Sequence, residues 1–307
     1  MNPSQLVVFS AIINCPSRAK ETMPSDPCHK VVSYQKLLAK PKNLRSCPYP
    51  ANPQARRQVP EPWNGDIDNA QVLIIGSNPA FDPNEVFPNR DTNWTSWADF
   101  GDGALWTDKD CEDFFEGRFG KAICPRNKQP YFDLDSKTVL NTNYHSLPFF
   151  RHKVQNSYWE TYDKYCSALS PASYLKGSYS FVVTDIVHCK SPMQYGVKQA
   201  LPVCINHTKK IIDLFVANNA KEHIILLIGA TPGANIKNLF GPVSIIGPAK
   251  PIGSYYDKTA KKNVTVFEQA VDHNGVVLSV FYNLLAPSGM NRAFRCPITI
   301  KGQIISW

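Results

Sequence analysis

The sequence feature that most constrains the fold is residues 70–81, where an apolar run leads directly into a polar turn. An apolar run that ends at Gly76 is typical of a strand covered on both faces. Gly76 permits a sharp backbone bend, and Pro79 fixes φ in the turn that follows. Asn78 is therefore expected at the carboxyl end of a strand, where open α/β sheets bind their ligands. The alternative is that Gly76 and Pro79 only punctuate a loop.

A second apolar run, residues 276–285, also predicts a buried strand, and it leads into Ala286, Pro287 and Ser288. Shorter strands are predicted at residues 138–143, 179–187 and 222–228, an amphipathic helix at 199–218, and a further helix just after Gly229. A helical face is also predicted for Cys111, Phe114, Phe115 and Phe119. Strands that alternate with helices predict an α/β fold with a parallel sheet and helices on both faces.

The two strand-end loops together resemble those of the uracil-DNA glycosylase superfamily. That family pairs a first motif, Gly-x-Asn/Asp/Glu-Pro/Ala, with a late Pro-Ser loop. The matches here are Gly76-Ser77-Asn78-Pro79 and Pro287-Ser288-Gly289. The resemblance spans residues 45 to 295 approximately. It implies a three-layer α/β/α sandwich with a central, mostly parallel sheet, and a DNA glycosylase that hydrolyses the N-glycosidic bond of a flipped-out base.

Composition agrees with a polyanionic partner such as DNA. Lys and Arg number 33 against 25 Asp and Glu, which gives a net charge of +8 and a pI near 8.9. Such an excess favours a polyanion without naming one. The 307 residues, 43% of them apolar, are enough for a large core. We expect residues 66–307 to form the glycosylase-like domain. Residues 1–65 would be a basic arm or lid, or equally a solvated extension.

Cysteine usage and hydropathy indicate the compartment. Nine cysteines, an odd and scattered set, favour a reduced interior over a disulfide framework. No apolar stretch reaches about 18 residues, which argues against a membrane span. Residues 6–13 are apolar, but no Lys or Arg precedes them, which argues against a secretory signal. A cytoplasmic monomer without a membrane partner is expected.

The resemblance assigns catalysis to Asn78. In the family, the polar residue of the first motif orients the water that attacks the sugar carbon. An amide positions water but is a poor base, which suffices if the transition state is oxocarbenium-like. Asp82 is a rival water activator, although it also suits a turn before Pro83. No cofactor is required for this chemistry.

The residues expected to read the base favour a modified cytosine. Asp185 stands where the family usually has an Asn. A carboxylate accepts from the exocyclic amine of cytosine and repels the 4-keto oxygen of uracil, whereas a protonated carboxyl would donate. The alternative is that Asp185 only caps a strand end. Ala80 stands where uracil-specific members carry a Tyr that blocks the pyrimidine 5-position. Together they resemble anti-phage members that remove glucosylated hydroxymethylcytosine.

The same resemblance assigns the remaining base-binding residues and the residues that would bind the DNA backbone. One of Phe87, Trp94 or Trp97 would stack on the extruded base, although most aromatics in residues 81–131 suit a core. The family's late His is replaced by Ala286, so first-motif backbone N–H groups, His188 or His145 would steady the leaving base. The base-binding set also includes Gly76, Ser77 and Phe81. The late loop would bind the DNA phosphates and fill the gap left by the base, through Ser288, Gly289, Met290, Asn291 and Arg292. The alternative for Arg292 is a solvated helix face.

Four cysteines suggest a structural iron–sulfur cluster. Fourteen residues separate Cys189 from Cys204, which resembles half of the site in thermophile-type glycosylases. A [4Fe–4S] cluster needs four thiolates. Cys47 fits a third, but Leu44 stands where its partner should be, so Cys28 would supply the fourth. The alternative is a set of free buried thiols.

Two other functions remain open from the sequence: a uracil-DNA glycosylase of base excision repair, and a non-catalytic nucleic-acid-binding module of the same fold. An α/β hydrolase would need a Gly-x-Ser-x-Gly nucleophile elbow. The sequence contains none.

Overall fold

The computed structural model describes residues 1–15, 25–28, 59–79, 107–116, 132–133, 138–139, 154–155, 157–170, 174–176, 180–189, 194, 196–218, 220, 222–257, 261–285 and 298–305. The chain divides into two compact units. The first unit is Met1–Asn64, Asn78–Val154 and Asp185–His207, and the second is Gly65–Ser77, Gln155–Thr184 and Thr208–Trp307. One division lies beside the expected boundary at residue 65, but residues 1–64 group with two later segments.

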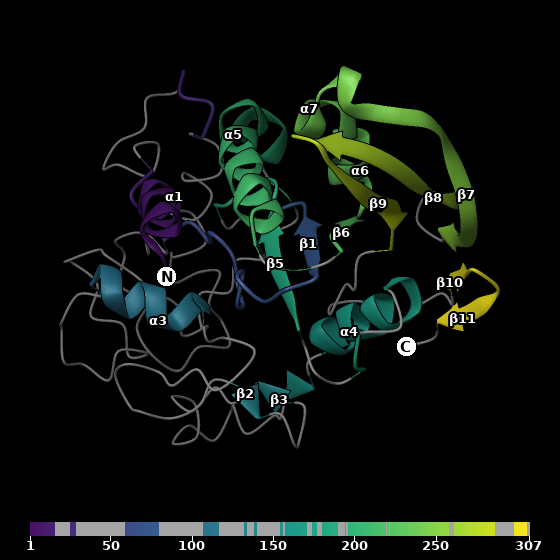
Figure 1. The fold of residues 1–307 in the computed structure, drawn as a ribbon, viewed down its shortest axis with the longest axis horizontal. Helices are drawn as coiled ribbons and strands as arrows, with labels where there is room; N and C mark the ends of the chain where they lie inside the picture. Colours follow the sequence, from purple (N-terminus) through teal and green to yellow (C-terminus); the bar gives the residue numbers. More distant parts are fainter. Residues whose placement is uncertain are drawn as a thin grey trace, which may run out of the picture. The chain divides into compact units, whose positions relative to one another are not determined.

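An eight-stranded mixed sheet dominates the second unit, with strand order β11-β10-β7-β8-β9-β6-β1-β5 (Figure 1). The strands are β1 (Val72–Gly76), β5 (Phe181–Asp185), β6 (Ile224–Ile228), β7 (Ile245–Asp257), β8 (Lys262–His273), β9 (Val276–Leu284), β10 (Ile298–Ile300) and β11 (Gln303–Ile305). The α/β class predicted from the sequence is confirmed.

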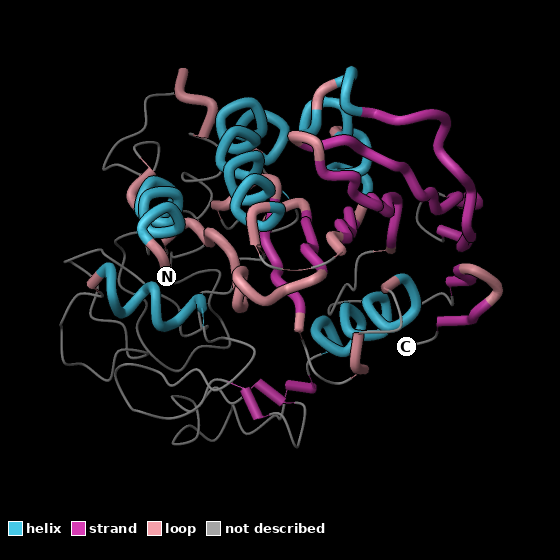
Figure 2. Tube along the Cα trace, in the orientation of Figure 1, coloured by secondary structure: helices cyan, strands magenta, loops and turns pink. Residues whose placement is uncertain are grey.

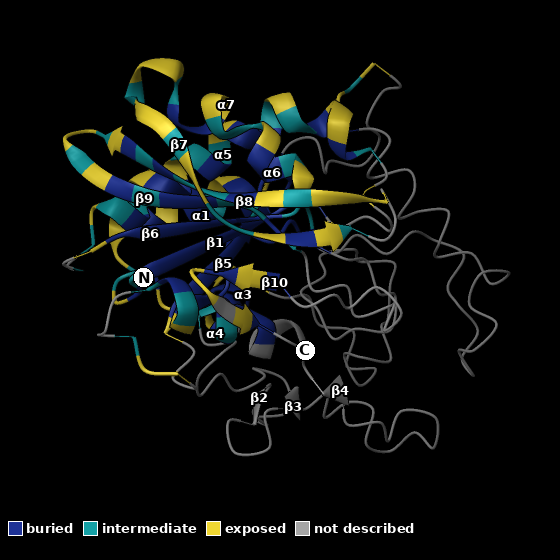
Figure 3. Ribbon diagram, turned by 90° about the vertical axis from the view of Figure 1, so that its right-hand side faces the viewer, coloured by how far each residue is buried: buried dark blue, intermediate teal, exposed yellow. Residues whose placement is uncertain are grey.

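The parallel part of the sheet is its most buried part. β6 pairs parallel with β1 on one side and with β9 on the other. Every residue of β1 and of β6 is buried, and both strands are dark blue in Figure 3. Full burial of one Val, Leu or Ile contributes about 1.5–3 kcal/mol. These short apolar runs could therefore be identified from the sequence, and their prediction as buried strands is confirmed.

The other half of the sheet is antiparallel, so the expectation of a mostly parallel sheet is wrong. β9 pairs antiparallel with β8, β8 with β7, and β10 with both β7 and β11. β9 also departs from the expected strand buried on both faces, because Val277 is 65% exposed. The long hairpin of β7 and β8 was not predicted, since much of β7 is exposed and contains Pro and Gly (Figure 3).

A wide irregularity in β7 is held by one buried glutamine. Three residues of β7 separate the pairs Ile246↔Ala270 and Lys250↔Glu268, where β8 has only Gln269. Gln269 Nε2 donates to the carbonyls of Ile246 (2.9 Å), Gly247 (3.2 Å) and Ala270 (3.1 Å). Gly247 takes the left-handed φ of +64° that this bulge requires. The bulge breaks the period-two pattern by which strands are recognised in sequence.

In the described part of the chain, four helices and one 3-10 turn accompany the strands of this sheet, and two of the helices were predicted from the sequence (Figure 2). They are α4 (Ser157–Leu169), α5 (Val197–Val216), α6 (Ala230–Ala234), α7 (Ile236–Phe240) and the 3-10 turn η6 (Pro242–Ser244). The helices predicted at 199–218 and after Gly229 are confirmed. α6 packs on β1, β6 and β9. In the described part of the chain, no helix has the length and apolar character needed to cross a membrane.

The first unit contains α1 (Pro3–Ile13), α3 (Asp108–Glu116) and a small sheet of β2 (Phe132–Asp133), β3 (Thr138–Val139) and β4 (Val154–Gln155), whose last residue is counted with the second unit. Phe9 of α1 meets Trp63 and Phe115 edge to face, with ring centroids 5.7 and 6.0 Å apart. Cys111 and Phe115 are fully buried, which confirms these two members of the predicted helical face. The described parts of residues 1–65 thus contribute to a core.

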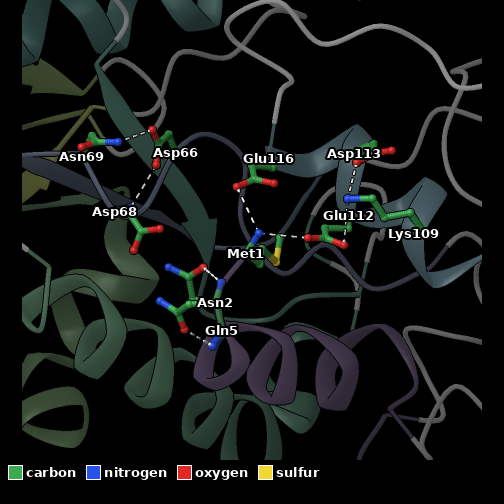
Figure 4. Close-up of polar contacts among 10 residues, drawn as sticks. All are labelled: Met1, Asn2, Gln5, Asp66, Asp68, Asn69, Lys109, Glu112, Asp113 and Glu116. Carbon is green, nitrogen blue, oxygen red and sulfur yellow. Dashed lines mark hydrogen bonds and ion pairs between the residues drawn. The ribbon is translucent and has the colours of Figure 1, made fainter.

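The amino terminus of α1 is held by polar contacts (Figure 4). Asn2 and Gln5 form a capping box that satisfies two backbone N–H groups. The Met1 ammonium lies 3.0 Å from Glu112 Oε1 and 3.6 Å from Glu116 Oε1 of α3. The hydrogen bond from this ammonium to Glu112 raises the pKa of the Met1 amine.

Candidate functional site

The first motif directly follows β1. Gly76 ends the strand, Ser77 is 9% exposed, and Asn78 is half-buried. Asn78 Nδ2 donates to the Pro79 carbonyl at 3.0 Å. Because the two ends of an amide point in opposite directions, this bond orients Oδ1 away from that carbonyl. Oδ1 can accept a hydrogen bond from a water molecule but cannot act as a strong base.

Asp185 lies at the end of the neighbouring strand. It is the last residue of β5 and is half-buried. β5 and β1 are adjacent in the sheet, and Figure 1 draws their arrows pointing the same way. The carboxyl ends of both strands therefore lie at one edge of the sheet. Asn78 and Asp185, which are 107 positions apart in the sequence, thus lie at or just after the ends of two adjacent strands.

His188, three residues after Asp185, is buried and neutral. It is 1% exposed, and its Nδ1 lies 2.8 Å from the Glu61 carbonyl. Since a carbonyl only accepts, Nδ1 carries the proton. Burial, with a smaller contribution from the nearby His207, lowers the pKa of His188 to about 3. A ring that is neutral at neutral pH cannot supply the positive charge of the family's late His, although it can still hydrogen bond.

Sequence analysis missed Glu61, which pairs with this strand end. Glu61 N donates to the His188 carbonyl at 2.8 Å, and the His188 ring donates back to the Glu61 carbonyl, so the two residues are bonded in both directions. Glu61 is only 6% exposed, and its carboxyl group accepts a hydrogen bond from Asn64 Nδ2. A buried carboxylate thus lies on the segment beside His188. The Pro-rich run of residues 59–64 resembles an ordinary loop in sequence, and no motif marks it.

Cys204 lies near two of the other predicted cluster cysteines, Cys28 and Cys189. Cys28, Cys189 and Cys204 are buried and are not in disulfides. The hydrogen bond with Cys28, together with burial and the nearby Cys189, raises the pKa of the Cys204 thiol well above its usual value. Closely spaced thiols of this kind suit a soft metal or an iron–sulfur cluster, which would favour the thiolate forms.

The described residues do not by themselves complete a metal site. Within them, no group of three or more His, Cys, Asp or Glu side chains has the arrangement needed to hold a metal ion. Cys47, the fourth predicted ligand, lies outside the described residues. The chemistry of the three gathered thiols fits a four-thiolate cluster only if Cys47 joins them.

Several predicted site residues lie outside the described residues, and their roles stay predictions. They are Ala80, Phe81, Asp82, Phe87, Trp94, His145, Ser288, Gly289, Met290, Asn291 and Arg292.

The strand that leads to the late loop is described up to Leu285. Gly229 N donates to the Leu284 carbonyl at 2.7 Å. The buried hydroxyl of Tyr165, on α4, donates to the Leu285 carbonyl at 3.0 Å. Sequence analysis did not identify Tyr165, because a tyrosine in an amphipathic helix is indistinguishable from other core aromatics.

No family model matches this sequence, and no curated protein is significantly similar to it. The family resemblance therefore rests on the motifs themselves and on the adjacent strand ends that carry Asn78 and Asp185.

Proposed function

We propose that this protein is a monofunctional DNA glycosylase of the uracil-DNA glycosylase type, with the three-layer α/β/α arrangement of that family. It flips a base out of DNA, hydrolyses the N-glycosidic bond and leaves an abasic site. The observation that carries the proposal is the placement of Asn78 and Asp185 after two adjacent strands of the sheet. Ligands bind at this edge in open α/β sheets.

In the proposed reaction Asn78 holds the attacking water through Oδ1. The water oxygen bonds to the sugar carbon while the carbon–nitrogen bond breaks, and that bond's electron pair leaves with the base. The proton lost by the water passes to solvent. Because positive charge develops on the sugar before attack is complete, placement of the water matters more than the strength of a base. Asp82 remains the second candidate for this step.

Asp185 supports a cytosine substrate. An ionised carboxylate at the end of β5 accepts a hydrogen bond from an exocyclic amine and disfavours a keto oxygen in the same place. By the family resemblance, Ala80 in place of the usual Tyr would leave room for a hydroxymethyl or glucosylated group. The favoured substrate is therefore 5-modified cytosine in bacteriophage DNA, and the protein would act as a cytoplasmic monomer in anti-phage defence.

A structural [4Fe–4S] cluster is part of the proposal but has no part in the reaction. Cys28, Cys189 and Cys204 would hold it together with Cys47. The supporting observation is the contact between the Cys28 and Cys204 thiols, with Cys189 close by. When bound, such a cluster would crosslink segments far apart in the chain.

The test is abasic-site formation on matched duplexes that contain uracil, cytosine, hydroxymethylcytosine or glucosylated hydroxymethylcytosine at one position. The Asn78→Ala protein is the control for contaminating glycosylases. Excision of modified cytosines alone supports the proposal. Excision of uracil alone would instead indicate a repair enzyme, and would remove the proposed roles of Asp185 and Ala80. Binding of DNA without excision of any base would indicate a non-catalytic module.

A further inference from the structure

One face of the sheet formed by β7, β8 and β9 carries aromatic side chains that reach solvent. Phe267 of β8 and Tyr282 of β9 are directly paired, and their rings stack with centroids 5.3 Å apart and an interplanar angle of 21°. Both residues are half-buried, and Tyr256 of β7 is 48% exposed. A near-parallel pair of rings with exposed surface can be extended by a further flat ring.

The strand register places Tyr256 on the same face as the stacked pair. Residues two positions apart along a strand share a face, and so do directly paired residues. Thr265, two positions from Phe267, pairs with Ser254, which is two positions from Tyr256. The rise per residue separates Tyr256 from Phe267 by about 14 Å along the strands. Ser254 and Thr265, which are both exposed, lie between them. We call this set the aromatic strip: Ser254, Tyr256, Thr265, Phe267 and Tyr282.

Among the described elements, the helices that cover this face end beside Tyr282. On the same face, His273 Nε2 lies 2.7 Å from Asp213 Oδ1 of α5, and its ring meets that of Phe240 of α7. A Cβ added to Gly233 of α6 would lie 3.7 Å from Tyr282 Cδ2. The β7–β8 hairpin reaches beyond α6 and α7 (Figure 1). The aromatic strip thus begins where the helical layer stops.

The charges of the hairpin suit a negatively charged partner on the strip. By strand alternation, the three carboxylates of β7 and β8 lie on the opposite face: Asp257, Glu268 and Asp272. Burial, followed by the charge of Asp257, raises the pKa of Tyr255 to about 12, so Asp257 lies near this buried residue of the opposite face. Lys261 and Lys262 are exposed at the end of the hairpin, and their long flexible side chains can reach either face.

We propose that the aromatic strip is a binding site for single-stranded DNA. Its bases stack on the Phe267–Tyr282 pair and on Tyr256, and its phosphates pass Lys261 and Lys262. The bases of a single strand are available for stacking on a protein, whereas those of a duplex already stack on one another. The net charge of +8 likewise favours a nucleic acid over a neutral partner.

The choice of DNA as the strand rests on the proposed function. β9 runs parallel to β6, and β6 runs parallel to β1, so these three strands end at the same edge of the sheet. Tyr282, near the end of β9, therefore lies toward the edge where β1 leads into the first motif. A single strand on the aromatic strip would extend from this edge along the hairpin.

The test measures the Kd of the full chain for a labelled oligothymidylate, which contains none of the proposed substrate bases. Phe267→Leu, Tyr282→Leu and Tyr256→Leu each remove one ring and keep apolar bulk. Each should raise Kd about 5- to 100-fold, the value of one stacked base, and leave the Kd for the matching duplex unchanged. The control is Val277→Ala, at a residue 65% exposed on the opposite face of β9, which should bind normally.

Two further readouts separate stacking from a purely structural effect. Tyr256→Trp keeps a ring at this exposed position and should retain the binding that Tyr256→Leu loses. Ultraviolet crosslinking of the oligothymidylate, mapped by mass spectrometry, should attach thymine to Tyr256 or to the Phe267–Tyr282 pair. Lys262→Gln should reduce the slope of log Kd against log salt by about 0.7, the value of one phosphate contact on a single strand.

Several outcomes would overturn the inference. They are an unchanged Kd in all three leucine variants, an equal loss in Val277→Ala, and ring-dependent binding of a neutral oligosaccharide such as cellohexaose in place of the oligothymidylate. If the variants within the stacked pair fold poorly, Tyr256→Leu decides, because its side chain is exposed. Base excision without ring-dependent binding would refute this inference alone. Ring-dependent binding without excision of any base would refute only the proposed function.

Discussion

Glu61 and His188 bond to each other in both directions, although 127 positions separate them. Glu61 N donates to the His188 carbonyl, and His188 Nδ1 donates to the Glu61 carbonyl, each at 2.8 Å. Both residues are almost completely buried. The imidazole thus replaces a backbone donor and joins residues 59–64 to the segment that follows β5.

This pairing predicts a dependence of stability on pH. The pKa of His188 is lowered from 6.5 to about 3 in the folded protein, because burial disfavours the charged ring. Between these values the unfolded chain binds more protons, so the free energy of unfolding falls as the pH falls below 6.5. The loss has an upper limit of about 5 kcal/mol.

The free energy of unfolding in urea, measured for the wild type and for His188→Asn at several pH values between 4.5 and 7.5, tests this effect. An Asn side chain can offer an N–H near the position of Nδ1 but does not titrate. The variant should show a flatter pH profile than the wild type. Identical profiles would show that His188 does not carry the dependence.

Asn78→Ala should abolish base excision and preserve DNA binding. Loss of the group that positions the water should lower kcat by about 10²–10³-fold, as for other groups that act mainly in the transition state. The control is Asn69→Ala, which removes an exposed amide that bonds only locally to Asp66 at 2.6 Å in the described contacts. Full activity in Asn78→Ala would transfer the role to another residue, with Asp82 the first to test.

Asp185→Asn should shift the base preference toward uracil, because an amide can donate to the 4-keto oxygen that a carboxylate repels. One such hydrogen bond changes discrimination about tenfold. The measurement is the ratio of kcat/KM values on uracil and on modified cytosine. Asp213→Asn makes the same chemical change at a side chain that is 52% exposed and paired with His273. An unchanged ratio in Asp185→Asn would remove this residue from base recognition.

Protein purified without oxygen should contain about four irons per chain if the cluster forms. Cys204→Ala should lose the iron and the acid-labile sulfide, because its thiol contacts that of Cys28. Cys111→Ala, which alters another buried thiol of the first unit, should retain both. Wild-type protein without iron, or Cys204→Ala protein with a full complement, would contradict the cluster assignment.

Gly253→Ala should loosen the hairpin of β10 and β11. An added Cβ would lie 1.9 Å from the Thr299 carbonyl oxygen and 3.0 Å from Ile300 Cα. Both are backbone atoms that cannot rotate away, so the expected cost is about 1–3 kcal/mol. Urea unfolding gives the free energy, and hydrogen exchange at residues 298–305 locates the change. Ser254→Ala, at the adjacent exposed position, should match the wild type in both.

The parallel strands and the long helix could be predicted because their pattern is local. β1 and β6 are uninterrupted apolar runs bounded by turn residues, and α5 repeats apolar residues at the helical period. The same reasoning placed Asn78 and Asp185 at strand ends, as the structure has them. β7 escaped prediction because its bulges break the alternation, and because the buried group that stabilises one of them is Gln269, a polar residue.

The amino-acid sequence by itself thus determined the fully buried strands β1 and β6 and where the motif residues Asn78 and Asp185 lie at strand ends, since both depend on neighbouring residues. The tertiary structure alone decided the strand order, the antiparallel half of the sheet and the pairing of Glu61 with His188 and of Tyr165 with Leu285. The pairings of Glu61 with His188 and of Tyr165 with Leu285 each join residues more than 100 positions apart. Each depends on how the chain packs, and the residues near either partner carry no signal for it.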